Sequence, residues 1–126
     1  MRAIKEYDMD FGVVEIFSHF LVNTPKPMVH IGKKEIEKLF EIAQQHFANK
    51  PFGFIAVRKH SISFDPTNYV QTQKRFPNLK SIAVVSTRAL TINFFDIEKK
   101  LINNAQAKLF NKKEDAFEWT LDVIKR

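Results

Sequence analysis

Residues 50–77, KPFGFIAVRKHSISFDPTNYVQTQKRFP, decide the fold that this sequence predicts. The run Phe52 to Val57 is apolar on both faces, which is typical of a central strand covered on two sides. The basic and hydroxyl-rich segment Arg58 to Phe64 follows as a turn. We expect a helix to start at Asp65-Pro66, because an Asp cap accepts backbone amides and proline suits the first helical position. A second buried strand, Ser81 to Ser86, comes next, so this part of the chain predicts the middle of an α/β domain.

The residues before this stretch predict two or three strands. Ala3 to Tyr7 alternates apolar and polar residues, the period of a half-buried strand. Gly12 to Val22 is rich in β-branched and aromatic residues, and it predicts one long strand, or a strand with a bend, antiparallel to the first. Pro25 and Pro27 should end that strand, because proline cannot donate to a sheet ladder. Met28 to Ile31 fits a short third strand.

Helical periodicity recurs on both sides of the central stretch. A helix is expected over Lys33 to Ala48, with Gly32 and Glu35 at its start and Asn49 in a left-handed conformation at its exit. Its buried face should be Ile36, Leu39, Phe40, Ala43 and Phe47. A later helix should run from a Thr91 cap to about Asn104. Its inward side chains should be Phe94, Phe95, Ile97, Leu101 and Ile102.

The C-terminal part of the chain predicts an edge strand and a last helix. Ala107 to Phe110 fits a short strand, and Asn111 with Glu114 three residues later forms a capping pattern. Residues 1–126 therefore predict one α/β domain, with a single mixed sheet of four or five strands flanked by about four helices.

Composition limits the class of protein. The chain contains thirteen Phe and no Cys, and its hydrophobic fraction is 44%, which indicates a real core. Without Cys there can be no disulfide and no thiolate metal site, and a reducing cytoplasm suits such a chain. The first ten residues, MRAIKEYDMD, carry charges throughout and do not resemble a signal peptide. No apolar run approaches the roughly 20 residues that span a bilayer. We therefore expect a cytoplasmic protein.

Positive charge is concentrated near the central stretch. The net charge is +6, and residues 51–80 hold five basic residues against one acid. A basic face can steer an anionic partner, and a solvated surface is the alternative interpretation. We do not expect a nucleic-acid partner, because these basic residues are not interleaved with exposed aromatic side chains.

The candidate functional face lies beyond the carboxyl ends of the two buried strands, where open α/β sheets place their sites. It consists of Arg58, Lys59, His60, Ser61, Ser63, Asp65, Thr67, Thr87 and Arg88. No nucleophile motif such as Gly-x-Ser-x-Gly is present, and the four histidines lack zinc-ligand spacing. No glycine-rich loop is present to hold a phosphate, and Asp65 would itself occupy the helix start. We expect neither catalysis nor a metal or other cofactor.

Three segments give the chain a family resemblance. KPFGFIAVRKHSISFDPTNYV (50–70), NLKSIAVVS (78–86) and KLFNKKEDAFEWTLDVI (108–124) resemble the SpoIIAA-like domains grouped with STAS modules, the anti-sigma-factor-antagonist type. The likeness covers residues 31–126. It implies a sheet of four or five strands flanked by helices and a regulatory binding module without a cofactor.

The resemblance also implies a place for phosphorylation. In antagonist STAS domains a Ser or Thr at the start of the helix after a central strand is phosphorylated by a partner kinase, which would change an interface through added charge. Ser63 and Thr67 occupy the matching place, although Phe64-Asp65-Pro66-Thr67 stands where the family has Asp-Ser-Ser/Thr-Gly. The alternative for both hydroxyls is a hydrogen bond to the backbone of the turn.

Two functions remain open from the sequence. The first is a non-enzymatic regulatory module that binds a protein partner through the face described above. The second is a carrier of a small apolar, lipid-like ligand, which Phe94 or Phe95 would serve by lining a cavity. The N-terminal strands also leave open an edge-to-edge homodimer.

Overall fold

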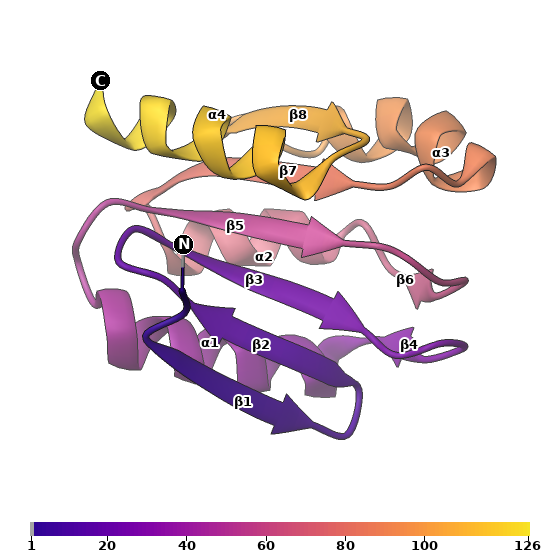
Figure 1. The fold of residues 1–126 in the computed structure, drawn as a ribbon, viewed down its shortest axis with the longest axis horizontal. Helices are drawn as coiled ribbons and strands as arrows, with labels where there is room; N and C mark the ends of the chain where they lie inside the picture. Colours follow the sequence, from indigo (N-terminus) through magenta and orange to yellow (C-terminus); the bar gives the residue numbers. More distant parts are fainter. Residues whose placement is uncertain (1) are drawn as a thin grey trace.

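The computed structural model describes residues 2–126, and within them the chain forms eight strands and four helices. Six strands make one sheet in the order β1-β2-β3-β5-β7-β8 (Figure 1). The first three strands pair antiparallel, and β3, β5, β7 and β8 run parallel. These strands are β1 (Lys5–Met9), β2 (Gly12–Ile16), β3 (Phe20–Pro25), β5 (Phe52–Val57), β7 (Leu79–Val85) and β8 (Gln106–Phe110). The α/β class with a mixed sheet is confirmed, and the sheet has six strands where four or five were expected.

The helices cover the sheet on both faces. Helices α1 (Lys33–Phe47) and α2 (Asn68–Arg75) lie behind it in Figure 1, and α4 (Lys113–Lys125) lies in front. The core is accordingly divided in two: Leu39 of α1 packs in one cluster, and Ala116 of α4 packs in the other. Helix α3 (Ala89–Lys99) lies beyond the end of β7, so it caps one end of the sheet more than it covers a face.

A second, two-stranded sheet lies at the same end as α3. It joins β4 (His30–Ile31) to β6 (Ser63–Phe64) in parallel, and both follow the arrowheads of β3 and β5 in Figure 1. The short strand expected at Met28 to Ile31 therefore exists, but it pairs with β6 and not with the main sheet. As a result, β4, β6 and α3 gather around the carboxyl ends of the parallel strands.

The two buried strands occupy the centre of the sheet, as expected. β5 has the predicted bounds, and β7 begins two residues earlier than predicted. Gly53 in β5 lies so close to α4 that an added Cβ would collide with the side chain of Thr120 and lie 2.6 Å from Ser81 Oγ. The helix can approach the sheet this closely because residue 53 has no side chain. Gly53 thus allows the short distance between the sheet and α4.

The segment Gly12 to Val22 is not one strand. It forms β2 and β3, which pair antiparallel across a tight turn closed by the hydrogen bond from Phe17 N to Phe20 O at 2.9 Å. The turn lacks Gly and Pro, the residues that usually mark one in a sequence. The strand was expected to end before Pro25, but β3 continues to that residue. Its parallel pairing with β5 stops at Asn23, so no amide donor is needed at Pro25 on that side.

Several helix boundaries also differ from the prediction. Helix α2 begins at Asn68, because Asp65 first forms a turn in which Oδ1 accepts the Thr67 amide at 3.0 Å. Helix α4 begins at Lys113 without a side-chain cap, so the expected Asn111 cap is wrong. At the end of α1 the residue with positive φ is Ala48 and not Asn49. Each error lies within a few residues of a helix end, where capping decides the boundary.

Helix α3 differs most from expectation. It begins at Ala89 and ends at Lys99, and Phe94 and Ile97 face solvent, while Phe95 and Ile102 are buried. The helix ends earlier than expected because the chain after it is hydrogen-bonded to the buried Gln73 of α2. The Oε1 of Gln73 accepts the amides of residues 103, 104 and 105 at 3.0, 2.8 and 3.3 Å. Its Nε2 donates to the carbonyl of Leu101 at 2.8 Å. One side chain thus supplies the polar partners for the second half of the connection from α3 to β8, whereas the amides of residues 100–102 bond to carbonyls of α3.

Replacing Gln73 with leucine should therefore destabilise the protein. We expect the Gln73→Leu variant to lose about 2–3 kcal/mol of unfolding free energy, because several backbone groups lose their partners and water can reach only some of them. Urea unfolding followed by circular dichroism measures the change. The control is Gln71→Leu on the exposed side of the same helix, which should stay within about 0.5 kcal/mol of wild type. Equal stability of the two variants would contradict this role of Gln73.

Candidate functional site

The candidate site is built on the loops that follow β5 and β7. Ser86 joins the two loops: its Oγ donates to the Arg58 carbonyl at 3.0 Å and accepts the Arg88 amide at 3.1 Å. The Arg58 amide in turn donates to the Val85 carbonyl at 2.8 Å. These bonds hold the first residues of both loops in register with the sheet. The side chains beyond them therefore project from a rigid edge.

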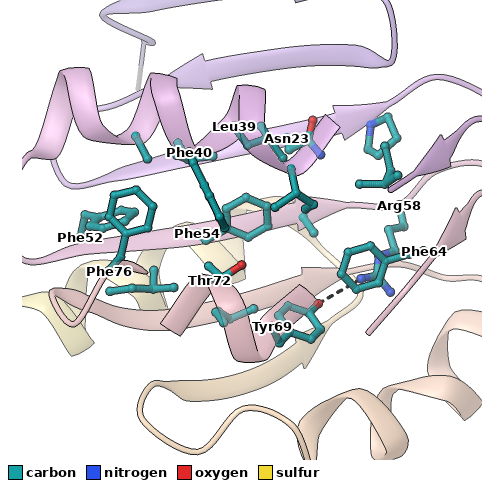
Figure 2. Close-up of a pocket in the computed structure, with 18 of the residues that line it drawn as sticks. Asn23, Leu39, Phe40, Phe52, Phe54, Arg58, Phe64, Tyr69, Thr72 and Phe76 are labelled. Atoms are coloured by element: carbon teal, nitrogen blue, oxygen red, sulfur yellow. Dashed lines mark hydrogen bonds between the residues drawn. The ribbon is translucent and has the colours of Figure 1, made fainter. Parts of the chain in front are cut away.

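Arg58 points inward from this edge and meets two buried partners. Its Nη1 donates to Glu98 Oε2 at 2.8 Å and its Nη2 to Glu98 Oε1 at 2.7 Å, a bidentate ion pair with α3. Nη2 also donates to the Tyr69 hydroxyl at 3.1 Å (Figure 2), and that hydroxyl donates to Glu98 Oε1 at 3.0 Å. Phe64 covers the group, with its ring 5.2 Å from the guanidinium carbon. The triad of Arg58, Tyr69 and Glu98 connects β5, α2 and α3.

The protonation states of the triad follow from burial and pairing. Burial is the largest single effect and would lower the pKa of Arg58, but the hydrogen bonds and charges of Glu98 and Tyr69 together outweigh it, so the net pKa is raised above its usual value. Burial raises the pKa of the Tyr69 hydroxyl well above its usual value. The arginine is therefore charged and the tyrosine neutral at ordinary pH. The charge of Arg58 is neutralised by Glu98, so it does not contribute a free cation to the surface.

A cleft of about 330 Å³ opens between the loop after β5 and helix α3. One wall belongs to residues 60–66, and the other to α3 and the residue before it. The lining side chains are Arg58, His60, Ser61, Ile62, Ser63, Phe64, Pro66, Arg88, Leu90, Thr91, Phe94 and Glu98. The cleft combines apolar surface with hydroxyls and cations, so it suits an occupant that has both apolar and polar parts.

The structure brings together part of the face predicted from the sequence. The predicted residues that line the cleft are Arg58, His60, Ser61, Ser63 and Arg88. The predicted residues that are exposed but do not line it are Lys59, Asp65, Thr67 and Thr87. Arg58 departs furthest from expectation, because only 7% of it is exposed and its charge is paired.

The two hydroxyls considered for phosphorylation already have side-chain partners. Ser63 Oγ lies 3.0 Å from His30 Nδ1, across the β4–β6 pair, and Thr67 Oγ1 donates to Asp65 Oδ1 at 2.7 Å. The side-chain and backbone hydrogen bonds from Thr67 lower the pKa of Asp65. Both hydroxyls are exposed, and their observed bonds go to side chains and not to the backbone of the turn.

Four residues that shape the site were missed at the sequence level. Tyr69, Glu98 and Leu90 were not among the predicted site residues, and Phe94 was expected to face inward or to line a ligand cavity. Glu98 did carry a signal, because it lies three residues after the buried Phe95 and thus on the same side of α3. An acid on the inner side of a helix implies a buried cation. Arg58, at the end of a buried strand, was the nearest candidate.

A second, internal cavity lies between the sheet and helices α1 and α2, and Figure 2 shows it. Its volume is about 50 Å³, and its lining is almost wholly apolar. Several aromatic rings line it, among them Phe40, Phe54 and Phe76 (Figure 2). The residues with polar groups among those that line it are Asn23, Arg58, Tyr69 and Thr72. Arg58, Ile62 and Phe64 line both this cavity and the surface cleft, so they separate the two spaces.

No protein-family model matches the chain, and comparisons with curated proteins and with solved structures found no significant similarity. Among residues 2–126, no three His, Asp or Glu side chains gather as a metal site would require. None of the helices in that range combines the length and apolar character needed to cross a bilayer.

Removing the charge of Glu98 should strongly destabilise the fold. The Glu98→Gln variant leaves the Arg58 charge buried without its counter-ion, so we expect a loss of about 3 kcal/mol or more in urea unfolding. Asp96→Asn, on the exposed side of the same helix, is the control and should change stability by less than about 0.5 kcal/mol.

A double variant separates the charge from the packing. Replacing both partners, Arg58→Met with Glu98→Leu, should recover most of the lost stability, because neither charge is then buried alone. If Glu98→Gln unfolded at the same urea concentration as Asp96→Asn, the ion pair would have no structural role.

Proposed function

We propose that this protein is a non-enzymatic binding module that recognises a protein partner through an apolar stripe on α3 and the adjoining cleft. The stripe consists of Leu90, Phe94 and Ile97, which lie four and three residues apart and so share one side of the helix. Their exposed fractions are 66%, 55% and 50%. The exposure of this stripe carries the proposal, because apolar patches on a surface commonly mark interaction sites.

The neighbouring charges indicate the chemistry of the partner. Lys59, Arg88, Lys99 and Lys100 are exposed on the loops and helix around the stripe, against Asp96 and Asp65. Arg58 and Glu98 neutralise each other and add nothing to this balance. The surface is therefore apolar at its centre and basic at its rim. It fits an amphipathic segment of a partner protein whose apolar face is flanked by acidic residues.

The cleft offers a place for an anchor residue. Leu90 and Phe94 line it from α3, and Ile62 and Phe64 line it from the facing loop. A volume of about 330 Å³ can accept one large side chain of the partner, the kind of buried contact that supplies most of the energy of an interface. The resemblance of residues 31–126 to SpoIIAA-like STAS domains supports a regulatory role for such binding. In those domains a Ser or Thr at the place matching Ser63 to Thr67 is phosphorylated by a partner kinase.

The test uses a partner identified by crosslinking in the host and then purified. We expect the double variant Leu90→Ser/Phe94→Ser to lower the affinity for that partner by at least about 30-fold, because two central apolar contacts are lost. Isothermal titration measures the affinity. The matched control is Ile4→Ser, which removes an apolar side chain that is 67% exposed at the start of the chain and should leave the affinity unchanged.

Charge at the rim gives an independent prediction. Arg88→Glu should weaken binding, mainly by slowing association, and should reduce the dependence of affinity on salt. A partner whose affinity is the same for wild type and the α3 double variant would place the interface elsewhere. If instead the wild type dimerised at micromolar concentration and the double variant did not, a second copy of this chain would be the occupant, and the proposed partner would be wrong.

A further inference from the structure

The six-stranded sheet has two open edges, formed by β1 and β8. β1 pairs only with β2, and β8 pairs only with β7. Figure 1 shows the two strands at opposite sides of the sheet, and each is five residues long. The outer side of each strand therefore carries backbone amides and carbonyls that no strand within residues 2–126 pairs with. Such an edge can accept a further strand.

On the face of the sheet where α1 and α2 pack, both edge strands carry apolar side chains. Tyr7 and Met9 of β1 and Ala107 of β8 are half-buried against the core cluster on that face. Leu109 lies two residues after Ala107 and so shares its face. A sheet continued from one edge into the other would keep apolar side chains beside apolar side chains.

On the face where α4 packs, the edge strand β1 is acidic. Glu6 and Asp8 point to this face, because they alternate with the half-buried residues of β1, and both are exposed. Glu6 lies directly opposite Glu15 of β2, and like charges in that position repel each other. Asp8 has only a distant, exposed contact with Lys26 at 4.0 Å. The acidic edge would therefore be stabilised by a further cation.

The edge strand β8 is basic on the same face. Phe110 points to it, because its ring packs on Trp119 of α4 with centroids 5.5 Å apart. Lys108 lies two residues earlier, so it shares this face, and it is exposed. Neither of the two salt bridges among residues 2–126 includes Lys108. The two open edges thus carry opposite charges on one face and apolar side chains on the other.

We propose that β8 of one copy pairs in parallel with β1 of a second copy, so that the sheet continues from one molecule into the next. Within one molecule β1 already runs in the same direction as β8, because two antiparallel pairings separate β1 from the parallel strands. A second copy in the same orientation therefore brings β1 beside β8 with both faces aligned. In the register that we infer, Lys108 lies opposite Asp8, and apolar residues lie opposite each other: Ala107 with Tyr7, and Leu109 with Met9.

The same charges disfavour the symmetric ways of joining two edges. Two β1 strands that pair antiparallel with matching faces set Glu6 or Asp8 of one copy against an acid of the other. Two β8 strands in their central register set Lys108 against Lys108. Like charges directly opposite each other destabilise a strand pair. A contact between unlike edges is heterologous, so the copies form an open chain and not a closed dimer.

Sedimentation equilibrium of the wild type tests this proposal. Two five-residue strands make a small contact, so association should be weak and visible at protein concentrations of about 1 mM. We expect the average mass to rise with concentration beyond that of a dimer, without a plateau. The α3 stripe takes no part in the contact, so Leu90→Ser/Phe94→Ser should associate like the wild type.

Charge variants test the register. Lys108→Glu sets an acid against Asp8, and Asp8→Lys sets a cation against Lys108, so each variant alone should stay monomeric. An equimolar mixture of the two should associate like the wild type, because each contact between unlike variants again joins opposite charges. Lys80→Glu is the matched control: it makes the same change of charge at an exposed position of β7, which has strands on both sides, and should associate normally. Circular dichroism first establishes that each variant is folded.

Four outcomes would overturn the proposal. A wild type that stays monomeric would show that the edges do not pair, and a mass that levels off at the dimer would show a closed contact. Association of Lys108→Glu alone, or failure of the mixture to associate, would show that Lys108 does not meet Asp8. Loss of association in the α3 double variant would place the contact on the stripe. Because that variant leaves both edges intact, the result separates this proposal from the proposed partner interface.

Discussion

The ion pair between Arg58 and Glu98 is the interaction on which the functional end of this molecule depends. It is bidentate, almost fully buried, and supported by the Tyr69 hydroxyl. By contrast, the pair of Lys26 and Asp8 is exposed and spans 4.0 Å, so its contribution is about 0–1 kcal/mol or less. A buried pair is costly to form and more costly to break. It therefore determines where α3 can sit relative to β5.

That position explains why α3 exposes apolar side chains. The helix has one inner side, which holds Glu98 and the buried Phe95. It packs at the end of the sheet and does not lie across a face, so no further element covers its outer side. Leu90, Phe94 and Ile97 therefore remain in solvent. The same placement opens the cleft, because the loop after β5 must pass over Arg58 before it pairs with β4.

The predictable and unpredictable parts of the fold differ in physical origin. The strand Phe52 to Val57 and the helix from Lys33 were found with nearly their observed bounds, since a long apolar run and a clear period report burial directly. The turn at Phe17 to His19 was missed because it contains neither Gly nor Pro, and a single serine between apolar residues is a weak turn signal. The orientation of α3 was wrong because periodicity identifies an apolar stripe without showing whether another element covers it.

The candidate site likewise has features that the sequence predicts and features that it does not. The loops after β5 and β7 were expected to meet at one edge of the sheet, and they do, because neighbouring parallel strands end together. The pairing of Arg58 with Glu98 was not predicted, because the two residues lie forty positions apart and their contact depends on tertiary structure. Asn23 gave no sequence signal at all: an asparagine near two prolines is read as part of a turn. That its side chain is buried and its Oδ1 unpaired among residues 2–126 is evident only from the fold.

The cleft and the internal cavity share a wall made of Arg58, Ile62 and Phe64. Phe64 packs edge-on against Tyr69 with centroids 5.1 Å apart, so its ring cannot move without disturbing the triad. An occupant on either side restricts the same three side chains. Where binding on one side changes affinity on the other, the effect must be equal in both directions, because the coupling free energy belongs to the pair of sites. Its size depends on how far the wall moves, and the bidentate, buried ion pair with Glu98 restrains Arg58 within that wall.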